Sequence, residues 1–199
     1  MVVRVIVVQH AEKERTAGDP ALTPRGHEQA IAVADWVGAT HPDALGVWSS
    51  PLARTRQTAD PIAAALGLPV HIDDRLVERM NWSDDRSQTL DEFLADWRHA
   101  SADRDHQPLQ GESSLQAGAR FVDALRAIAE QVVDGVAVVV SHGGVTVDAL
   151  RTLVGDAAVD AAGPTLVTDG VPNGAVTILS VELGQVDVVS YPDTHHLER

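Results

Sequence analysis

The stretch Val5-Ile6-Val7-Val8-Gln9-His10 is an apolar run that ends on a histidine, and the chain uses the same design a second time. The second run is Val136-Ala137-Val138-Val139-Val140-Ser141-His142-Gly143-Gly144. Both runs are rich in β-branched residues without polar alternation, which is typical of strands that are buried on both faces. Ligand sites in open α/β sheets form where such strands end. We therefore expect His10 and His142 to lie in one shared site.

Strand and helix patterns alternate along the rest of the chain. The expected strands cover residues 2–8, 45–49, 70–72, 136–140, 171–181 and 185–190. The expected helices run from 24 to about 38 behind the cap residue Thr23, from 51 to 67 behind Ser50, and from 145 to 154. Two further helices begin at the capping box Thr89-Leu90-Asp91-Glu92 and at Ser113 or Ser114. This alternation predicts an α/β fold, a three-layer αβα sandwich with a mostly parallel central sheet, in a single domain over residues 1–199.

The composition limits the classes of protein that fit this chain. Its 199 residues carry a net charge of −14, which disfavours a nucleic acid or an anionic membrane as a partner, and we ascribe the acidity to solubility. The chain has no cysteine, so neither disulfides nor thiolate chemistry contributes. The sequence shows no signal-peptide pattern and no apolar run long enough to cross a bilayer. We expect a cytoplasmic protein.

A third strand end carries an arginine. The segment Ser49-Ser50-Pro51-Leu52-Ala53-Arg54 leads from the expected strand at 45–49 into the next helix. A guanidinium group can bind two phosphate oxygens at once, and the N-terminus of a helix favours an anion further. Arg54 is therefore the best candidate for a phosphate ligand, whereas Arg56 is interpreted as a cation on the exposed face of the helix. Two histidines and an arginine at neighbouring strand ends indicate phosphoryl chemistry at a histidine.

Several segments spread over nearly the whole chain together resemble the histidine phosphatase superfamily, which includes the cofactor-dependent phosphoglycerate mutases. They are the opening strand with His10, residues 22–30, residues 50–58, Leu76-Val77-Glu78-Arg79, Gly111-Glu112-Ser113, residues 140–144 and Asp193-Thr194-His195-His196-Leu197. Any one of these motifs is weak alone, but their order and spacing make the set specific. The resemblance implies a phosphoglycerate mutase-like fold and a reaction that needs neither a metal ion nor a cofactor.

The resemblance also implies that His10 is the nucleophile and carries the phosphoryl group as phosphohistidine. Histidine suits this role because neutral imidazole is nucleophilic near pH 7 and its phosphoramidate hydrolyses readily. His142 would then stabilise charge on the transferring phosphoryl oxygens. Gly143 and Gly144 let the backbone approach that anion, or they only make the tight turn from strand to helix.

Glu78 is the expected general acid and base. It would protonate the leaving alkoxide and then activate water against phosphohistidine, which requires partial burial to tune its carboxyl group for proton transfer. The alternative is a loop carboxylate that pairs with Arg79 or Arg75. Arg79 matches the arginine beside the acid in mutase-like members of the family, and we expect it to contact the phosphate or carboxylate of the substrate.

Gln9 is the main departure from the family pattern, because the family's first motif reads Arg-His-Gly and this chain reads Gln9-His10-Ala11. In the family that arginine binds phosphate. Gln9 is placed to bind substrate through its amide donors, but it has no charge, and losing one preorganised stabiliser typically costs about 10²–10³ in rate. Lys13, the only lysine of the chain, or Arg15 can restore the charge by folding back to the site. Alternatively, Lys13 is a solvated residue paired with a neighbouring glutamate.

These residues favour a metal-independent phosphomonoesterase that acts on a small phosphorylated metabolite. The alternative that Gln9 raises is a catalytically weakened protein on the same fold, which binds a phosphorylated ligand for regulation. A phosphoglycerate-type mutase ranks last, since the polar loop at 101–111 is short for a lid over such a substrate. Trp82 is expected to line the substrate pocket, whereas the other three tryptophans, Trp97 among them, are interpreted as packing residues.

Overall fold

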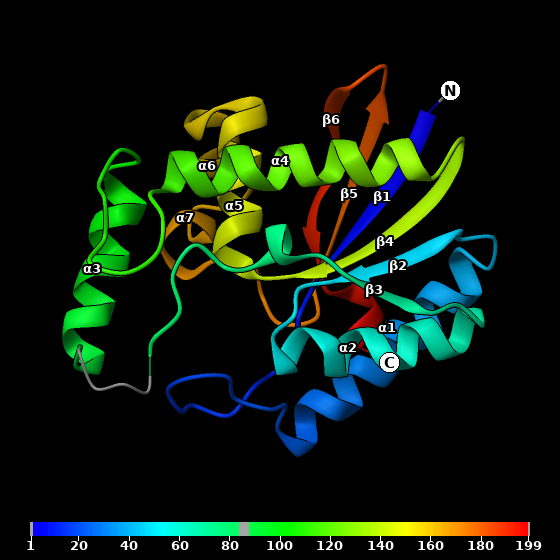
Figure 1. Cartoon of the computed structure of the whole chain (residues 1–199), viewed down its shortest axis with the longest axis horizontal. Coiled ribbons are helices and arrows are strands. Elements are labelled where there is room, and N and C mark those ends of the chain that lie inside the picture. Colours follow the sequence, from blue (N-terminus) through cyan, green and yellow to red (C-terminus); the bar gives the residue numbers. More distant parts are fainter. Residues whose placement is uncertain (1, 84–87, 199) are drawn as a thin grey trace.

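The computed structural model describes residues 2–83 and 88–198, and its centre is one mixed β-sheet (Figure 1). The strands are β1 (Val2–Gln9), β2 (Gly46–Ser49), β3 (Val70–Ile72), β4 (Gly135–Ser141), β5 (Val176–Glu182) and β6 (Gln185–Asp193). They lie in the order β3-β2-β4-β1-β5-β6. The pairings among β1 to β4 are parallel, and β5 pairs antiparallel with both β1 and β6. The expected mostly parallel sheet is confirmed.

Helices cover both faces of the sheet, as the αβα prediction requires. They are α1 (Pro24–Thr40), α2 (Ala53–Leu66), α3 (Leu90–Ala102), α4 (Ser114–Gln131), α5 (Gly143–Val154), α6 (Asp156–Ala162) and α7 (Leu166–Asp169), with 3₁₀ turns η1 (Asp74–Leu76) and η2 (His195–Leu197). α1 and α2 pack on one face together with Ile6 and Val8 of β1. α4 and α5 pack on the opposite face together with Val5 and Val7. Successive residues of one strand thus enter two apolar cores, which is why the β1 run shows no polar alternation.

The register of the two central strands brings the histidines to one edge of the sheet. β1 and β4 pair in parallel, with Val7 opposite Val139 and Gln9 opposite Ser141. The residue that follows β1 is His10, and the residue that follows β4 is His142, so both side chains leave the sheet at its carboxyl edge. β2 lies beside β4 in the same direction, and α2 with its arginine follows β2. Three strand ends therefore meet where the sequence predicts a site.

Side-chain caps set the starts of α1, α3 and α4 where the sequence predicts them. The hydroxyl of Thr23 accepts a backbone N–H of the first turn of α1 at 2.9 Å. The capping boxes at Thr89 and Ser113 are both formed, so Ser113 and not Ser114 is the cap of α4. α2 differs from the prediction, because it begins at Ala53 and not at residue 51. Its first N–H is donated to the carboxylate of Asp19, at 2.8 and 3.0 Å, from a distant loop.

Some expectations about the later elements are wrong. The strand expected from residue 171 begins only at Val176, because Pro172 cannot donate to a strand ladder and Gly174 has a φ of 70°. α5 begins at Gly143 rather than at residue 145. α6 and α7 were not expected, and neither of these short helices begins with a side-chain cap that would mark it in the sequence.

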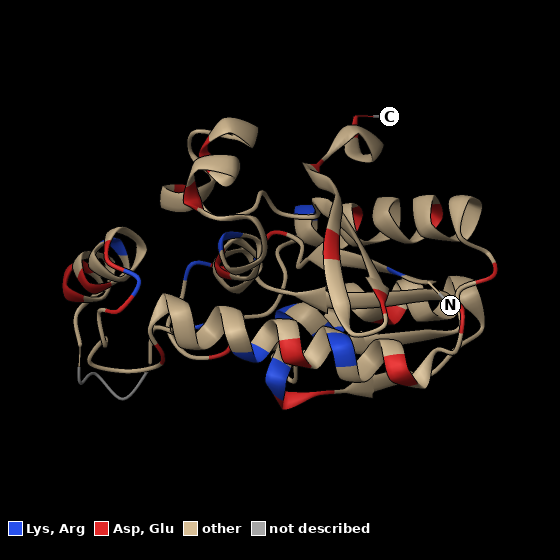
Figure 2. Ribbon diagram, turned by 90° about the horizontal axis from the view of Figure 1, so that it is seen from above, with Lys and Arg blue, Asp and Glu red and all other residues tan. Residues whose placement is uncertain are grey.

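Charged side chains are spread over the molecule. Figure 2 shows Asp and Glu distributed over helices on both sides of the sheet, interspersed with fewer Lys and Arg. The net charge of −14 is therefore not gathered on a single element. Within residues 2–83 and 88–198, no helix is both long enough and apolar enough to span a bilayer.

Gly118 determines how closely α4 and α5 pack. A Cβ atom at this position would lie 2.5 Å from the carbonyl oxygen of Asp148 and 2.5 Å from Oγ1 of Thr152, both on α5. We predict that Gly118→Ala lowers the free energy of unfolding by about 1–3 kcal/mol, the usual effect of overpacking, although alanine is the better helix former. Gly38→Ala in α1 is the control, because its Cβ would meet the Cβ of Ala65 at an ordinary 3.5 Å. Urea denaturation should show the control to be at least as stable as the wild type, and equal effects of the two substitutions would contradict the packing argument.

Candidate active site

A cavity of about 450 Å³ opens at the carboxyl edge of the sheet. The predicted site residues that line it come from different elements: His10 follows β1, Arg54 lies in the first turn of α2, and Glu78 follows η1. Lys13, in the loop after β1, also lines this cavity. The structure therefore brings the expected nucleophile, acid and cations together, as the strand ends predict.

His10 is held in one tautomer by its own backbone. Its Nδ1 lies 2.8 Å from the carbonyl oxygen of Ala11, which can only accept, so Nδ1 carries the proton and Nε2 keeps its lone pair. The residue is 6% exposed, and burial lowers the pKa of His10 to about 3, with the charge of Arg54 adding to the effect. At neutral pH His10 is therefore a neutral imidazole whose Nε2 is left for a ligand.

His142 lies fully buried against His10, with the ring centroids 5.3 Å apart in an edge-to-face arrangement. Its Nε2 is 2.9 Å from the hydroxyl of Ser50, and its Nδ1 has no partner among the described residues. Burial lowers the pKa of His142 well below its usual value, and Arg54 contributes again. Ser50, expected to cap α2, thus holds a neutral imidazole in place. His142 lies behind His10 and is not itself among the described residues that line the cavity.

Arg54 brings an unsatisfied guanidinium group to the cavity. The residue is 3% exposed, its Nη2 donates to Oδ1 of Asn81 at 3.2 Å, and its Nη1 lies 3.9 Å from a carboxylate oxygen of Asp19. Its Nε and Nη1 have no hydrogen-bond acceptor in the part of the chain that the structure describes. Burial lowers the pKa of Arg54, but a guanidinium group stays charged in proteins. Buried cationic donors without an acceptor form a site for an anion.

Lys13 and Arg15 supply further positive charge to the same cavity. Both residues line it, and burial, together with the charges of Arg54 and Arg15, lowers the pKa of Lys13. The Nζ of Lys13 lies 3.4 Å from the backbone carbonyl oxygen of Glu14, which is a contact with the main chain and not an ion pair. Of the two alternatives for Lys13, the structure thus favours the cation that faces the site.

Glu78 caps the first turn of α5 from a distant part of the chain. Its Oε2 accepts the N–H of Gly144 at 2.8 Å, and its Oε1 accepts the N–H groups of Val145 at 2.7 Å and Arg79 at 2.9 Å. These donors and the positive end of the helix dipole fix the carboxyl group at the cavity wall. Each carboxylate oxygen has two lone pairs, so Oε2 keeps one that can hold a proton.

Gly144 is the glycine that this arrangement requires. A Cβ atom there would lie 2.7 Å from Oε1 of Glu78 and 2.5 Å from the ring of Trp97. The backbone N–H of Gly144 already serves the carboxylate of Glu78. The anion that the backbone of Gly144 binds at this turn is therefore the carboxylate of Glu78, a group of the protein itself.

Gln9 and Gly143 lie against each other outside the cavity wall. A Cβ atom at Gly143 would lie 3.3 Å from Nε2 of Gln9 and 2.9 Å from the backbone N of Val171. Gln9 is 6% exposed, and its Oε1 has no partner within the described ranges. Neither residue belongs to the described lining of the cavity. The expected substrate contacts of Gln9 and Gly143 stay predictions.

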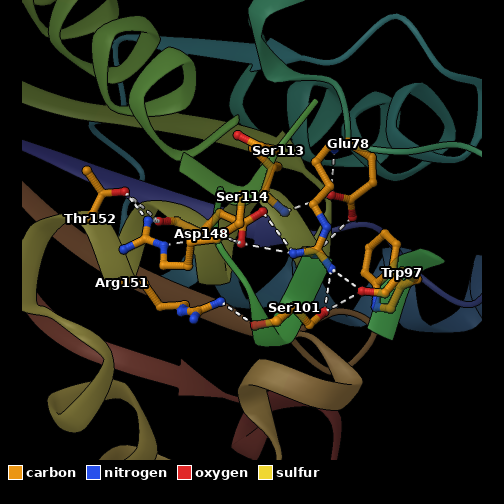
Figure 3. A network of polar contacts seen from close by, with 12 residues as sticks. Glu78, Trp97, Ser101, Ser113, Ser114, Asp148, Arg151 and Thr152 are labelled. Carbon is orange, nitrogen blue, oxygen red and sulfur yellow. Dashed lines mark hydrogen bonds and ion pairs between the residues drawn. The ribbon is translucent and has the colours of Figure 1, made fainter. Parts of the chain in front are cut away.

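Arg79 takes part in a buried polar network with Trp97, Ser101 and Asp148, which Figure 3 labels. The residue is 2% exposed; its Nη1 pairs with Asp148 at 3.0 Å, and its Nη2 donates to Oγ of Ser101 at 2.5 Å and to the carbonyl oxygen of Trp97 at 3.3 Å. The ring of Trp97 lies over this guanidinium group, with its centroid 4.0 Å away. Arg79 is not among the described residues that line the cavity, and its expected contact with substrate stays a prediction. The alternative for Glu78 was a pairing with Arg79 or Arg75, whereas in the structure Arg79 pairs with Asp148 and Arg75 pairs with Asp73.

Asp148 is the acidic partner in this network. It is fully buried, and it also accepts the hydroxyl of Ser114 at 2.6 Å. Burial raises the pKa of Asp148 to about 6, while the charge of Arg79 opposes this rise. The sequence carries no signal for the pairing, because the two residues are 69 positions apart on different elements.

α3 supplies an apolar wall of the cavity that the sequence predicts only in part. Leu90, Phe93, Leu94 and Trp97 all line the cavity. The predicted place of Trp82 in the pocket is confirmed, whereas Trp97 lines it as well and is more than a packing residue. The helical spacing of these residues is visible in the sequence, but the side of the molecule that they face is not.

The donors that converge on the cavity suit an anion. They are guanidinium, ammonium and imidazole groups, which bind phosphate or carboxylate oxygens and repel a cation. The described residues contain no group of three or more His, Asp or Glu side chains arranged to hold a metal ion.

Known proteins share the sequence pattern of this chain. A model of the histidine phosphatase superfamily (branch 1) matches residues 5–194. The chain is 34% identical over 154 residues to a probable phosphoglycerate mutase GpmB of Escherichia fergusonii, a match that covers 70% of this chain and 69% of that protein. It is 42% identical over 83 residues to phosphoserine phosphatase 1 of Hydrogenobacter thermophilus, covering 38% of each chain.

Solved structures share the fold. A mycobacterial glucosyl-3-phosphoglycerate phosphatase superposes with a TM-score of 0.74 at 24% identity, covering 98% of this chain and 100% of that one. The YhfR protein of Bacillus stearothermophilus superposes with a TM-score of 0.76 at 20% identity, with the same coverage of 98% and 100%. Since the family model spans nearly the whole chain and the fold agrees, the protein belongs to the histidine phosphatase superfamily.

Proposed function

We propose that the protein is a phosphomonoesterase that works without a metal ion, through a phosphohistidine on His10. One observation carries this proposal: a neutral, buried His10 imidazole shares a cavity with the unsatisfied Nε and Nη1 donors of Arg54. Neutral imidazole is nucleophilic near pH 7, and a guanidinium group binds two phosphate oxygens. The phosphatase names among the relatives and the structural neighbours support a hydrolase.

The first step transfers the phosphoryl group to His10. The lone pair of Nε2 attacks phosphorus, the P–N bond forms while the P–O bond to the alcohol breaks, and the leaving oxygen takes the proton held on Oε2 of Glu78. Arg54 neutralises charge on the transferring phosphoryl oxygens. When Ser50 donates to Nε2 of His142, the proton of that ring sits on Nδ1 and is donated to one of the same oxygens.

The second step returns the enzyme to its starting state. The carboxylate of Glu78 takes a proton from a water molecule as the water oxygen attacks the phosphorus of phosphohistidine. A P–O bond forms, the P–N bond breaks with its electron pair returning to Nε2 of His10, and inorganic phosphate leaves. Lys13 and Arg15 line the cavity and supply positive charge that Gln9 lacks, which supports turnover over binding alone.

A phosphoglycerate-type mutase is the second candidate, because the relative from Escherichia fergusonii is named a probable phosphoglycerate mutase. A mutase of this type must bind a substrate that carries a carboxylate beside its phosphate. The arginine expected to serve this purpose, Arg79, is buried in its pair with Asp148 and is not part of the described cavity lining. This arrangement favours hydrolysis over phosphoryl exchange.

Metal-free hydrolysis of p-nitrophenyl phosphate tests the roles of His10 and Arg54. We predict that His10→Asn abolishes turnover in the presence of EDTA, and that Arg54→Gln lowers kcat/KM by about 10²–10³, the usual effect of losing one preorganised stabiliser. Arg56→Gln is the matched control, because it removes an exposed cation from the same helix and should retain wild-type activity. Turnover that persists in His10→Asn, or equal losses in the two arginine variants, would rule out this mechanism.

The role of Glu78 is tested by varying the leaving group. An alkoxide needs a proton to leave, whereas p-nitrophenolate leaves without one. We predict that Glu78→Gln lowers kcat/KM by about 10²–10⁴ for an alkyl phosphate, the range typical of general acid–base catalysis, and by less than about tenfold for the first step with p-nitrophenyl phosphate. Stopped-flow release of p-nitrophenolate isolates that step from the later hydrolysis. Equal losses for both esters would mean that Glu78 only caps α5.

The buried neutral state of His10 makes the stability of the fold depend on pH. The unfolded chain protonates this histidine below about pH 6.5, whereas folded His10 has a pKa of about 3. The unfolded state therefore binds more protons in this window, so the free energy of unfolding falls as the pH falls. We predict that the free energy of unfolding falls between pH 7 and pH 5 by about 2 kcal/mol less in His10→Asn than in the wild type. Urea denaturation at both pH values measures this difference, with the exposed His27→Asn as the control; a wild-type pH dependence in His10→Asn would contradict a neutral His10.

A further inference from the structure

The apolar stripe of α3 faces the cavity and not a core. Leu90, Phe93, Leu94 and Trp97 recur at i, i+3, i+4 and i+7, the spacing by which an amphipathic helix usually packs against other elements. All of them line the cavity. Leu90 and Leu94 remain 45% and 40% exposed, and the helix buries only small residues near its C-terminus.

This helix is attached to the body of the protein by polar contacts. α3 stands at one end of the molecule, beyond the sheet (Figure 1). Arg79 joins α3 to α5, because its guanidinium group contacts Ser101 and the carbonyl oxygen of Trp97 on α3 and also Asp148 on α5. Figure 3 shows these three partners. Leu94 takes part in none of these contacts, and its partly exposed apolar side chain lines the cavity, where a ligand can reach it. Clustered apolar groups left open at a cavity mark a binding surface.

The positive groups of the cavity gather near the nucleophile. Lys13 and Arg15 line a second, adjoining cavity together with His10 and with no residue of α3, and Arg54 and Lys13 both lower the pKa of His10, so these cations lie at the His10 end. No Lys or Arg of α3 is among the described residues that line the cavity. Arg79, the cation beneath this wall, is already paired with a carboxylate. A charged group on the alcohol part of a substrate would therefore meet the α3 wall without a partner, which is unfavourable.

We propose that the alcohol part of the substrate is an uncharged, apolar group about as large as an aromatic ring, which packs on the α3 stripe while its phosphate binds at His10 and Arg54. This inference rests on the phosphatase function proposed above and narrows its substrate class. The cavity of about 450 Å³ is within the usual range for small-molecule sites. Met80 and Trp82 line the same cavity and extend its apolar surface.

Two alkyl phosphates separate the selectivity of the pocket from the reactivity of the leaving group. 2-Phenylethyl phosphate and O-phosphoserine both release a primary alcohol, but only the second carries charges beside the phosphate. We expect kcat/KM without metal ions to favour 2-phenylethyl phosphate by at least about tenfold. Leu94→Asn should lower kcat/KM for this ester roughly tenfold and leave that for O-phosphoserine unchanged. Leu115→Asn on α4, which alters a leucine of the same 40% exposure away from the described lining, should change neither value.

Binding of phosphonates tests the apolar site independently of the proposed phosphatase function. 3-Phenylpropylphosphonate and 2-amino-4-phosphonobutanoate replace the ester oxygen of the two substrates by CH₂ and cannot be hydrolysed. Calorimetry should give a Kd at least about tenfold lower for the phenyl compound, and Leu94→Asn should remove this difference. Equal or tighter binding of the amino-acid phosphonate would overturn the apolar site even where His10-dependent turnover is present. Selective binding of the phenyl compound without such turnover would retain the apolar site and refute the phosphatase function.

Discussion

The buried ion pair between Arg79 and Asp148 connects the parts of the active site to one another. The backbone N–H of Arg79 donates to Glu78, while its guanidinium group reaches Asp148 on α5 and Ser101 on α3. Glu78, the helix that it caps and the apolar wall are thus all joined to one residue. Because both charges are buried, removing one partner leaves the other uncompensated, which typically costs about 3–5 kcal/mol. The pair holds the guanidinium group of Arg79 between α3 and α5, outside the described lining of the cavity.

The electrostatics of the cavity follow from the same burial. His10 and His142 lie out of water and beside Arg54, so both imidazoles stay neutral although anion-binding cations surround them. Burial is the larger cause of this neutral state of His10, and the charges of Arg54 and Lys13 add to it. In the proposed reaction, a phosphate dianion bound to these cations would cancel much of their field. The same cations would then both attract the substrate and keep Nε2 of His10 unprotonated.

The sequence predicts the part of the site that strand ends carry. His10, His142 and Arg54 can be placed without a structure, because parallel strands deliver their carboxyl ends to one edge of a sheet. Arg79 and Gly143 cannot, because distant residues decide what they touch. Asp148 is 69 positions from Arg79, and its pairing leaves no local pattern in the chain. Such roles follow from packing in three dimensions and not from spacing along the chain.

The attachment of α3 has a consequence for how this pocket can vary. Leu90, Phe93 and Leu94 lie outside the two cores that pack on the sheet, so changes at these three positions leave that packing in place. The reacting groups, in contrast, sit at the ends of strands that those cores hold rigid. With the proposed function, the reacting groups and the surface that selects the substrate thus belong to separate parts of the chain. Substitutions in one helix would then change which substrate binds while the reacting groups stay in place.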